Sequence, residues 1–172
     1  GGSTELVVEE RAVIRAHSMQ VGCVRLTERF FADDPPSTPA LAAAGEVVDD
    51  AFATAIGAQP ALVRPGARTV VGLAGTVSTL AALDLGLERY DESALHHHWL
   101  SLEAIRSWLA ALAGEPIAAR RVRPGMVPGR EDVIVAGVLV LERVVTLLGA
   151  PGCLSSEHDI LDGLARSVLA AA

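Results

Sequence analysis

The sequence predicts one mixed α/β domain. Strand-like segments come first in the chain, strands and helices alternate afterwards, and no long linker divides the 172 residues. Apolar residues make up 51% and charged residues 20%, which is the composition of a packed globule. A chain of this length buries roughly two-thirds of its unfolded surface. We therefore predict a single domain over residues 1–172.

The first third of the chain is predicted to hold antiparallel strands and a long helix. Residues 5–8 and 12–16 have the pattern of two strands around a polar turn, and residues 18–24 are predicted to add a third. A short helix over 25–30 ends at the Asp-Asp-Pro-Pro stretch, because a residue before proline leaves the helical region. Thr38 followed by Pro39 predicts a helix that continues to Gly57.

The rest of the chain alternates between strands and helices. Residues 68–73 are predicted to form a buried strand that leads into a helix over 80–85, and Ser101 opens a helix that ends before Gly114. Residues 125–129 are predicted to form a loop. Residues 132–148 are apolar on nearly every side, which predicts the most buried helix of the domain.

The C-terminal segment is predicted to hold a last strand and a last helix. Residues 152–155 have strand character, and Ser156 with Asp159 three residues later resembles a capping box. The helix that follows is expected to turn Leu161, Leu164 and Val168 toward the core.

Charge and composition exclude several classes of partner. The net charge of −7 argues against a nucleic-acid partner. The longest wholly apolar run, residues 133–141, is far shorter than the roughly 20 residues of a membrane span. Cys23 and Cys153 have no metal-ligand spacing and make no disulfide scaffold. We expect a cytoplasmic protein without a signal peptide or a membrane partner. An apolar face of the cleft would allow two copies of the chain to associate, so a homodimer is possible.

The first candidate site is the N-terminal segment Gly1-Gly2-Ser3-Thr4-Glu5. Two glycines let the backbone approach a ligand and aim its N–H groups at an anion, and two hydroxyls add donors. The carboxylate of Glu5 suits a metal or an attacking water. The alternative is a glycine turn with a solvated glutamate.

The second candidate site is the Gly-Thr segment after the strand at 68–73. A strand that turns through Gly75 into a helix, with hydroxyls in the first turn, favours anion binding. The segment is neither a Walker loop nor a GxGxxG motif. The alternative is that Thr76 or Ser78 only caps the helix.

Several motifs, in the same order along the chain, resemble one family. GGSTEL resembles the end of the DIGGGSTE motif of the exopolyphosphatase and guanosine-pentaphosphate phosphatase (Ppx/GppA) family. Residues 17–28, 71–76, 130–137 and 155–165 are also similar to that family, so the resemblance covers nearly the whole chain. It implies a ribonuclease-H-like domain with a mixed sheet and flanking helices, as in the actin-like ATPase superfamily. This domain would be the second lobe of a two-domain enzyme, with the first lobe and the aspartate that opens the motif missing from this chain.

The resemblance also implies roles for individual residues. Glu5 would be the catalytic residue and would lie near Mg²⁺ and the attacked phosphorus. The other implied residues would bind phosphate: Gly1, Gly2, Ser3, Thr4, Arg25, Gly75 and Thr76. Ala74 departs from the family pattern, because many relatives have glycine there.

The activity implied is release of terminal phosphate from inorganic polyphosphate or from guanosine pentaphosphate (pppGpp), by metal-assisted attack of water. No residue separates these two substrates. The alternative is a non-hydrolytic nucleotide- or polyphosphate-binding regulator of the same superfamily, and a sugar-kinase lobe is disfavoured. We expect this chain alone to fold but to be inactive.

Two other groups of residues have open interpretations. Two interpretations are open for Arg120, Arg121, Arg123 and Arg130: a basic patch that guides a polyanion, or a solvated loop in which Arg130 pairs structurally. The run His96-His97-His98 is interpreted as a surface segment, since consecutive side chains diverge and do not converge on a metal. Trp99 and Trp108 are expected to pack.

Overall fold

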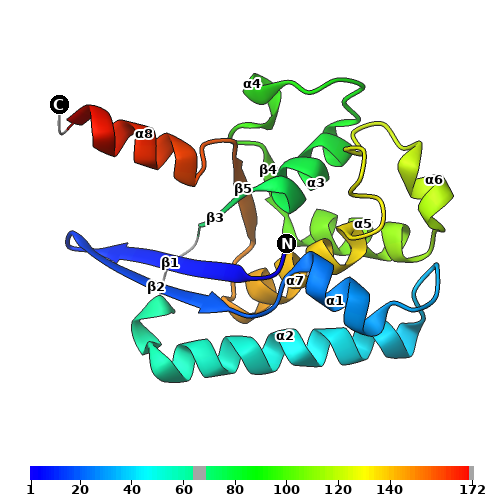
Figure 1. The fold of residues 1–172 in the computed structure, drawn as a ribbon, viewed down its shortest axis with the longest axis horizontal. Helices are drawn as coiled ribbons and strands as arrows, with labels where there is room; N and C mark the ends of the chain where they lie inside the picture. The colour runs from blue at the N-terminus through cyan, green and yellow to red at the C-terminus, as the bar shows by residue number, and fades with distance from the viewer. Residues whose placement is uncertain (64–68, 171–172) are drawn as a thin grey trace.

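The computed structural model describes residues 1–63 and 69–170, and it confirms the mixed α/β class (Figure 1). Its elements, in chain order, are β1 (Thr4–Glu10), β2 (Val13–Met19), α1 (Cys23–Phe30), α2 (Thr38–Ala58), the short 3₁₀ turn η1 (Pro60–Leu62), β3 (Val70–Leu73), α3 (Gly75–Leu85), α4 (Glu92–Leu95), β4 (Trp99–Ser101), α5 (Leu102–Ala113), α6 (Ile117–Arg121), α7 (Ile134–Leu147), β5 (Gly152–Ser156) and α8 (Ile160–Ala170). None of the helices in the described ranges is long and apolar enough to cross a membrane.

The chain opens with the predicted hairpin. β1 and β2 pair antiparallel, from Thr4 opposite Met19 to Glu10 opposite Val13. The turn lies at Arg11 and Ala12, whose φ angles of 49° and 63° match the right-handed twist of the strands.

The predicted third strand over 18–24 is wrong. Ser18 and Met19 extend β2 and Cys23 already begins α1, whose inner side buries Leu26 beside Met19 and Val21. The apolar residues of this segment lead into a helix instead of a strand, and they pack in the core against residues of α2.

The second sheet is mixed, as predicted. Its order is β3-β5-β4, with β3 parallel and β4 antiparallel to β5. The sequence did not predict β4, α4 or α6, which have only three to five residues and therefore show no periodicity. Arg68, in the predicted strand over 68–73, lies outside the described residues.

Side-chain caps fix the starts of two helices. Ser37, rather than the predicted Thr38, caps α2: its Oγ accepts the Ala40 N–H at 3.4 Å. Ser101 caps α5 as expected, because its Oγ accepts the Ala104 N–H at 3.0 Å. Both helices therefore begin with an amide donor satisfied by a side chain.

Helix α7 is the centre of the domain, as its sequence predicted. It contacts α1 and α2 on one side and α3 and α5 on the other, and ten of its residues are buried (Figure 1). Its one buried charge, Glu142, accepts hydrogen bonds from Arg106 Nε at 2.8 Å and Thr146 Oγ1 at 2.9 Å. The buried carboxylate is therefore paired, as a charge in a core must be.

Helix α8 departs from its prediction. Leu161, Leu164 and Val168 are 69%, 61% and 62% exposed, not buried, and the helix extends away from the rest of the domain (Figure 1). The predicted capping box shifts as well, because the helix begins at Ile160. The Asp159 carboxylate accepts the Leu161 N–H at 2.7 Å, whereas the Ser156 hydroxyl bonds to His158. Helical periodicity showed an apolar face but not whether this domain covers it.

Candidate functional site

The N-terminal glycine segment lies against the start of α1. Gly1 accepts the Val24 N–H at 3.0 Å, and Gly2 accepts the Arg25 Nε–H at 3.1 Å. A β-carbon on Gly22, the residue before α1, would overlap Gly1 and Ser3, so only glycine permits this approach. The segment is thus held mainly by backbone contacts with α1.

The side chains of this segment have defined partners. The Thr4 hydroxyl donates to the Val21 carbonyl at 2.7 Å. One oxygen of Glu5, Oε1, accepts from Ser3 Oγ at 2.7 Å and from Ser18 Oγ at 3.0 Å. These two donors orient an exposed carboxylate at the beginning of β1, and its Oε2 has no partner within the described ranges.

The second glycine segment forms the start of α3. Ala74 precedes it with a φ of 72°, and no side chain caps the helix. The Ser78 hydroxyl is directed elsewhere, to Glu157 Oε1 at 2.6 Å. Thr76 packs against α7, where a β-carbon on Gly137 would overlap its side chain. The N–H groups of Val77 and Ser78 bond to the Ala74 carbonyl, at 3.0 and 3.2 Å, so the N–H groups of Gly75 and Thr76 are the ones that have no acceptor within the described ranges.

Arg130 lies directly over this helix start. A β-carbon on Gly75 would overlap the Arg130 guanidinium, so the glycine makes room for the arginine. Within the described part of the chain, Arg130 has no carboxylate partner. The other three arginines of the group are all paired: Arg120 with Asp34, Arg121 with Glu131 and Arg123 with Glu115. Those three arginines thus form structural ion pairs, whereas the predicted structural pairing of Arg130 is wrong for the described part of the chain.

The loop before α7 fixes the position of Arg130. The neighbouring Glu131 is buried, and its carboxylate accepts from the Gly129 N–H at 2.7 Å and from Arg121 Nε at 2.8 Å. Its own backbone N–H and the Arg121 guanidinium lower the pKa of Glu131. The loop is therefore held by a carboxylate that stays ionised at neutral pH.

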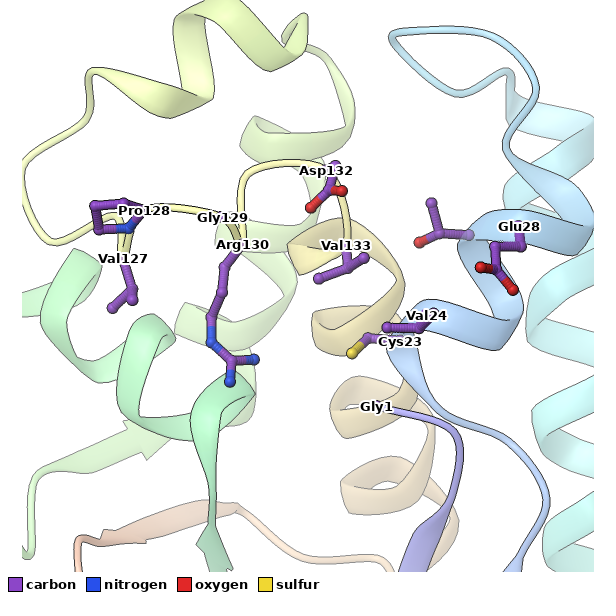
Figure 2. Close-up of a pocket in the computed structure, with 11 residues that line it drawn as sticks. Gly1, Cys23, Val24, Glu28, Val127, Pro128, Gly129, Arg130, Asp132 and Val133 are labelled. Atoms are coloured by element: carbon purple, nitrogen blue, oxygen red, sulfur yellow. The ribbon is translucent and has the colours of Figure 1, made fainter.

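Two cavities meet at Arg130. The first, of about 680 Å³, lies between Gly1, the start of α1 and the loop before α7 (Figure 2). The second, of about 440 Å³, is lined by the start of α3, including Gly75, and by the same loop. Of the predicted site residues, Gly1 lines the first cavity and Gly75 lines the second, and Arg130 lines both. The other predicted residues line neither cavity: Gly2, Ser3, Thr4, Glu5, Arg25 and Thr76. Phosphate binding by the implied residues stays a prediction.

Histidines gather at the end of β5, but they form no metal centre. No group of three or more His, Cys, Asp or Glu side chains within residues 1–63 and 69–170 is arranged to hold a metal ion. Of the predicted surface run only His97 is exposed. His98 Nε2 lies 2.7 Å from Asp84, which also accepts from Trp108 Nε1, and the His96 ring lies 4.5 Å from that of His158.

One feature of the site was missed by sequence reasoning. Glu157 accepts hydrogen bonds from Ser78 and, at 2.9 Å, from Tyr90, and this hydrogen bond raises the pKa of Tyr90 to about 12. Tyr90 lines the second cavity. No local pattern connects three residues this far apart, so only the folded chain reveals the contact.

Comparison with known proteins decides the family. A family model described as the Ppx/GppA phosphatase family matches residues 1–165. The chain belongs to the Ppx/GppA phosphatase family. Exopolyphosphatase 2 of Mycobacterium tuberculosis is 38% identical over 172 residues, covering 98% of this chain and 53% of that protein. A bifunctional 3-dehydroquinate synthase/phosphatase of Fusobacterium nucleatum is 26% identical, covering 95% of this chain and 24% of that protein.

Solved structures agree with this membership. The crystal structure of the Ppx/GppA family member of Aquifex aeolicus matches with a TM-score of 0.88 at 28% identity, covering 99% of this chain and 54% of that one. An exopolyphosphatase from Cytophaga hutchinsonii, at 23% identity and a TM-score of 0.80, shows the same fold. The chain therefore has the ribonuclease-H-like fold of the actin-like ATPase superfamily. It spans about half the length of the Mycobacterium protein.

Proposed function

We propose that this chain is the second lobe of a phosphohydrolase that releases terminal phosphate from inorganic polyphosphate or pppGpp. The observation that carries the proposal is the Arg130 guanidinium, which has no carboxylate partner in the described ranges, lies on Gly75 and lines one cavity with Gly1 and the other with Gly75. A cation over an open helix start, beside a glycine segment, suits a phosphate group. Family membership supports the same chemistry.

The proposed mechanism assigns the residues of this chain to binding and orientation. Arg130 and the first N–H groups of α3 hold phosphate oxygens, and the N-terminal glycine segment approaches the chain of phosphates from the other side. Glu5, oriented by Ser3 and Ser18, faces the reacting phosphate and positions the attacking water. In phosphoryl transfer, positioning and charge neutralisation provide most of the catalysis.

Mg²⁺ fits this site only as an ion shared with the substrate. Glu5 supplies one carboxylate, and Mg²⁺ typically takes one or two carboxylates together with substrate phosphates and waters. When bound, it would neutralise charge on the phosphates. The remaining determinants, including a general base, are proposed to lie in a first lobe that adjoins this chain in the complete enzyme. A cytoplasmic location and a homodimer remain predictions from the sequence.

A binding experiment tests the phosphate site. Tripolyphosphate, titrated into this chain with Mg²⁺ in a calorimeter, should bind, and Arg130→Gln should weaken binding by about 10- to 100-fold through loss of charge-assisted hydrogen bonds. Arg166→Gln, which removes the same charge from exposed α8, should change the affinity less than about twofold. Equal effects of the two substitutions would show that only net charge matters and would refute the site.

An activity experiment tests the two-lobe mechanism. Phosphate release from polyphosphate and pppGpp is compared for this chain and for a protein in which a first lobe precedes it. Loss of a positioned general base costs about 10²–10⁴-fold, so this chain alone should be nearly inactive. If it matches the longer protein and Glu5→Gln abolishes its activity, the proposed mechanism is wrong. Tight binding without hydrolysis by the longer protein would favour the regulatory alternative.

A further inference from the structure

Glu157 connects the end of β5 to the first turn of α3. It directly follows β5, and its Oε1 accepts the Ser78 hydroxyl of α3 at 2.6 Å. Its Oε2 accepts the hydroxyl of Tyr90, in the segment after α3, at 2.9 Å. Hydrogen bonds to a charged acceptor are about twice as strong as neutral ones, so this carboxylate fixes both segments relative to β5. One side chain therefore orients the helix start at which the N–H groups of Gly75 and Thr76 have no acceptor within the described ranges.

The backbone of Glu157 is held by a histidine. Its N–H donates to Nδ1 of the His96 ring at 3.2 Å. A ring nitrogen accepts a hydrogen bond only while it carries no proton, so this contact needs the neutral form of His96 with its proton on Nε2. In the charged form both ring nitrogens are donors, and the Glu157 N–H would then face another N–H group. Protonation of His96 therefore removes the contact.

The surroundings of His96 disfavour its charged form. The ring centroids of His97 and His158 lie 3.8 and 4.5 Å from that of His96. Partial burial, and then the charges of these two histidines, lower the pKa of His96, whereas the carboxylates of Glu92 in α4 and of Glu157 act in the opposite direction. The net effect is a lowered pKa, so the hydrogen bond to Glu157 persists at neutral pH and is lost only below the ordinary histidine value of 6.5.

We propose that Glu157 is a positioning residue of the phosphate site and that neutral His96 is needed to keep it in place. With its N–H bonded to the ring, Glu157 reaches Ser78 and orients the start of α3 for a phosphate beside Arg130. Protonation of His96 releases the end of β5 from the ring, and the first turn of α3 loses its anchor. The inference rests on the proposed phosphate site and adds its regulation: acid weakens phosphate binding through two residues that line neither cavity.

The sign of the pH effect distinguishes this positioning from a simple effect of charge. A proton on His96 adds positive charge to the domain, which by itself would favour an anion. Loss of the anchor acts in the opposite direction, because binding then has to order the helix start. Weaker phosphate binding at acid pH is therefore the expected mark of the positioning role.

Tyr90 provides a readout without any ligand, because it is the only tyrosine of the chain. Its ring signals are followed by NMR on protein with labelled tyrosine between pH 8 and pH 5. They should shift with a midpoint below 6.5 in the parent chain and stay nearly unchanged in His96→Asn, whose amide oxygen is an acceptor that does not titrate. His97→Asn is the matched variant, since asparagine tolerates the φ of 68° at this position. It should keep the transition but move its midpoint to higher pH, because a repelling charge beside His96 is removed.

A binding experiment connects this contact to the phosphate site. Tripolyphosphate with Mg²⁺ is titrated into the parent chain and into His96→Asn at pH 7.5 and at pH 5. Protonation of the ligand is the same for both proteins, so only the difference between them counts. The two should bind alike at pH 7.5, and at pH 5 the parent should bind about three- to tenfold more weakly than His96→Asn, the factor expected for one lost hydrogen bond.

Two substitutions isolate the side chain of Glu157. Glu157→Gln and Glu157→Leu both remove the negative charge, but only glutamine keeps an acceptor oxygen for Ser78. At pH 7.5 the leucine variant should therefore bind tripolyphosphate about three- to tenfold more weakly than the glutamine variant. Equal binding by the two variants would overturn the positioning role.

The remaining outcomes separate this inference from the proposed function. If the Tyr90 signals titrate identically in the parent and in His96→Asn, or if acid strengthens parental binding relative to that variant, the inference fails while the phosphate site stands. A Tyr90 response through His96 with equal binding by both proteins at pH 5 would also overturn it, because the contact would then serve the fold alone. Absence of tripolyphosphate binding to the parent at pH 7.5 would overturn the proposed function, and the regulation with it.

Discussion

The contact between α3 and α7 predicts an unusual response to a glycine-to-alanine substitution. A β-carbon on Gly137 would lie 2.5 Å from Oγ1 and 2.8 Å from Cγ2 of Thr76. Alanine in a helix interior is normally favoured over glycine by about 0.8–1.0 kcal/mol, but overpacking costs about 1–3 kcal/mol. Gly137→Ala should therefore lower the free energy of unfolding by roughly 0–2 kcal/mol.

A double-mutant cycle with Thr76→Ala, measured by urea unfolding, tests whether the Thr76 side chain causes this loss. Thr76→Ala removes the two closest atoms and leaves its Cβ at 3.2 Å from the added carbon. In that background Gly137→Ala should instead stabilise by about 0.5–1 kcal/mol, which gives a coupling energy of about 0.5–3 kcal/mol.

A control substitution in α2 provides the reference. A β-carbon on Gly45 meets no atom within 4 Å, so Gly45→Ala should stabilise the chain by about 1 kcal/mol. If Gly137→Ala stabilises the parent chain as much as Gly45→Ala does, and the cycle shows no coupling, then α3 does not start against α7 as described.

Two more predictions concern the core and the site loop. Leu139→Ala in α7 should lower the free energy of unfolding by about 2–5 kcal/mol because this side chain is only 6% exposed. Leu141→Ala should cost less, because Leu141 is only half-buried. Equally small losses for both variants in urea unfolding would show that α7 lies at the periphery of the domain. The pKa of Glu131 is lowered in the folded chain, so its contribution to stability is present above its ordinary value of 4.5 and is lost as the pH falls through its lowered pKa. Glu131→Gln should therefore destabilise the chain at pH 7 and much less near pH 3, and a pH-independent difference in unfolding free energy would contradict this assignment.

Local patterns predicted the elements that have strong periodicity or clear caps. The hairpin, the capped α5, the buried α7 and the strand β5 were all predicted near their observed positions. Elements of three to five residues were missed because they are shorter than one period of the pattern that would indicate them. The segment over 18–24 was misassigned because apolar composition alone does not distinguish a short strand from a helix start.

The candidate site was predicted in part. The two glycine segments were identified from their residue types and from the family resemblance, and one residue of each, Gly1 and Gly75, lines a cavity with Arg130. Which arginine remains free for a ligand was not predictable, because the partners of Arg120 and Arg121 depend on contacts made only in the folded chain. The hydrogen bond between Tyr90 and Glu157 was likewise unpredicted.

The sequence by itself determined the fold class, the family and the positions of the glycine segments, because these depend on short motifs and on periodicities within single elements. The tertiary structure decided three further features: that α8 keeps its apolar face exposed, that Arg130 lies on Gly75, and that two cavities share Arg130 in their lining. Each of these depends on which distant surfaces meet. Burial and ion pairing arise from contacts between elements that are distant in the sequence, so they cannot be read from any single segment of the chain.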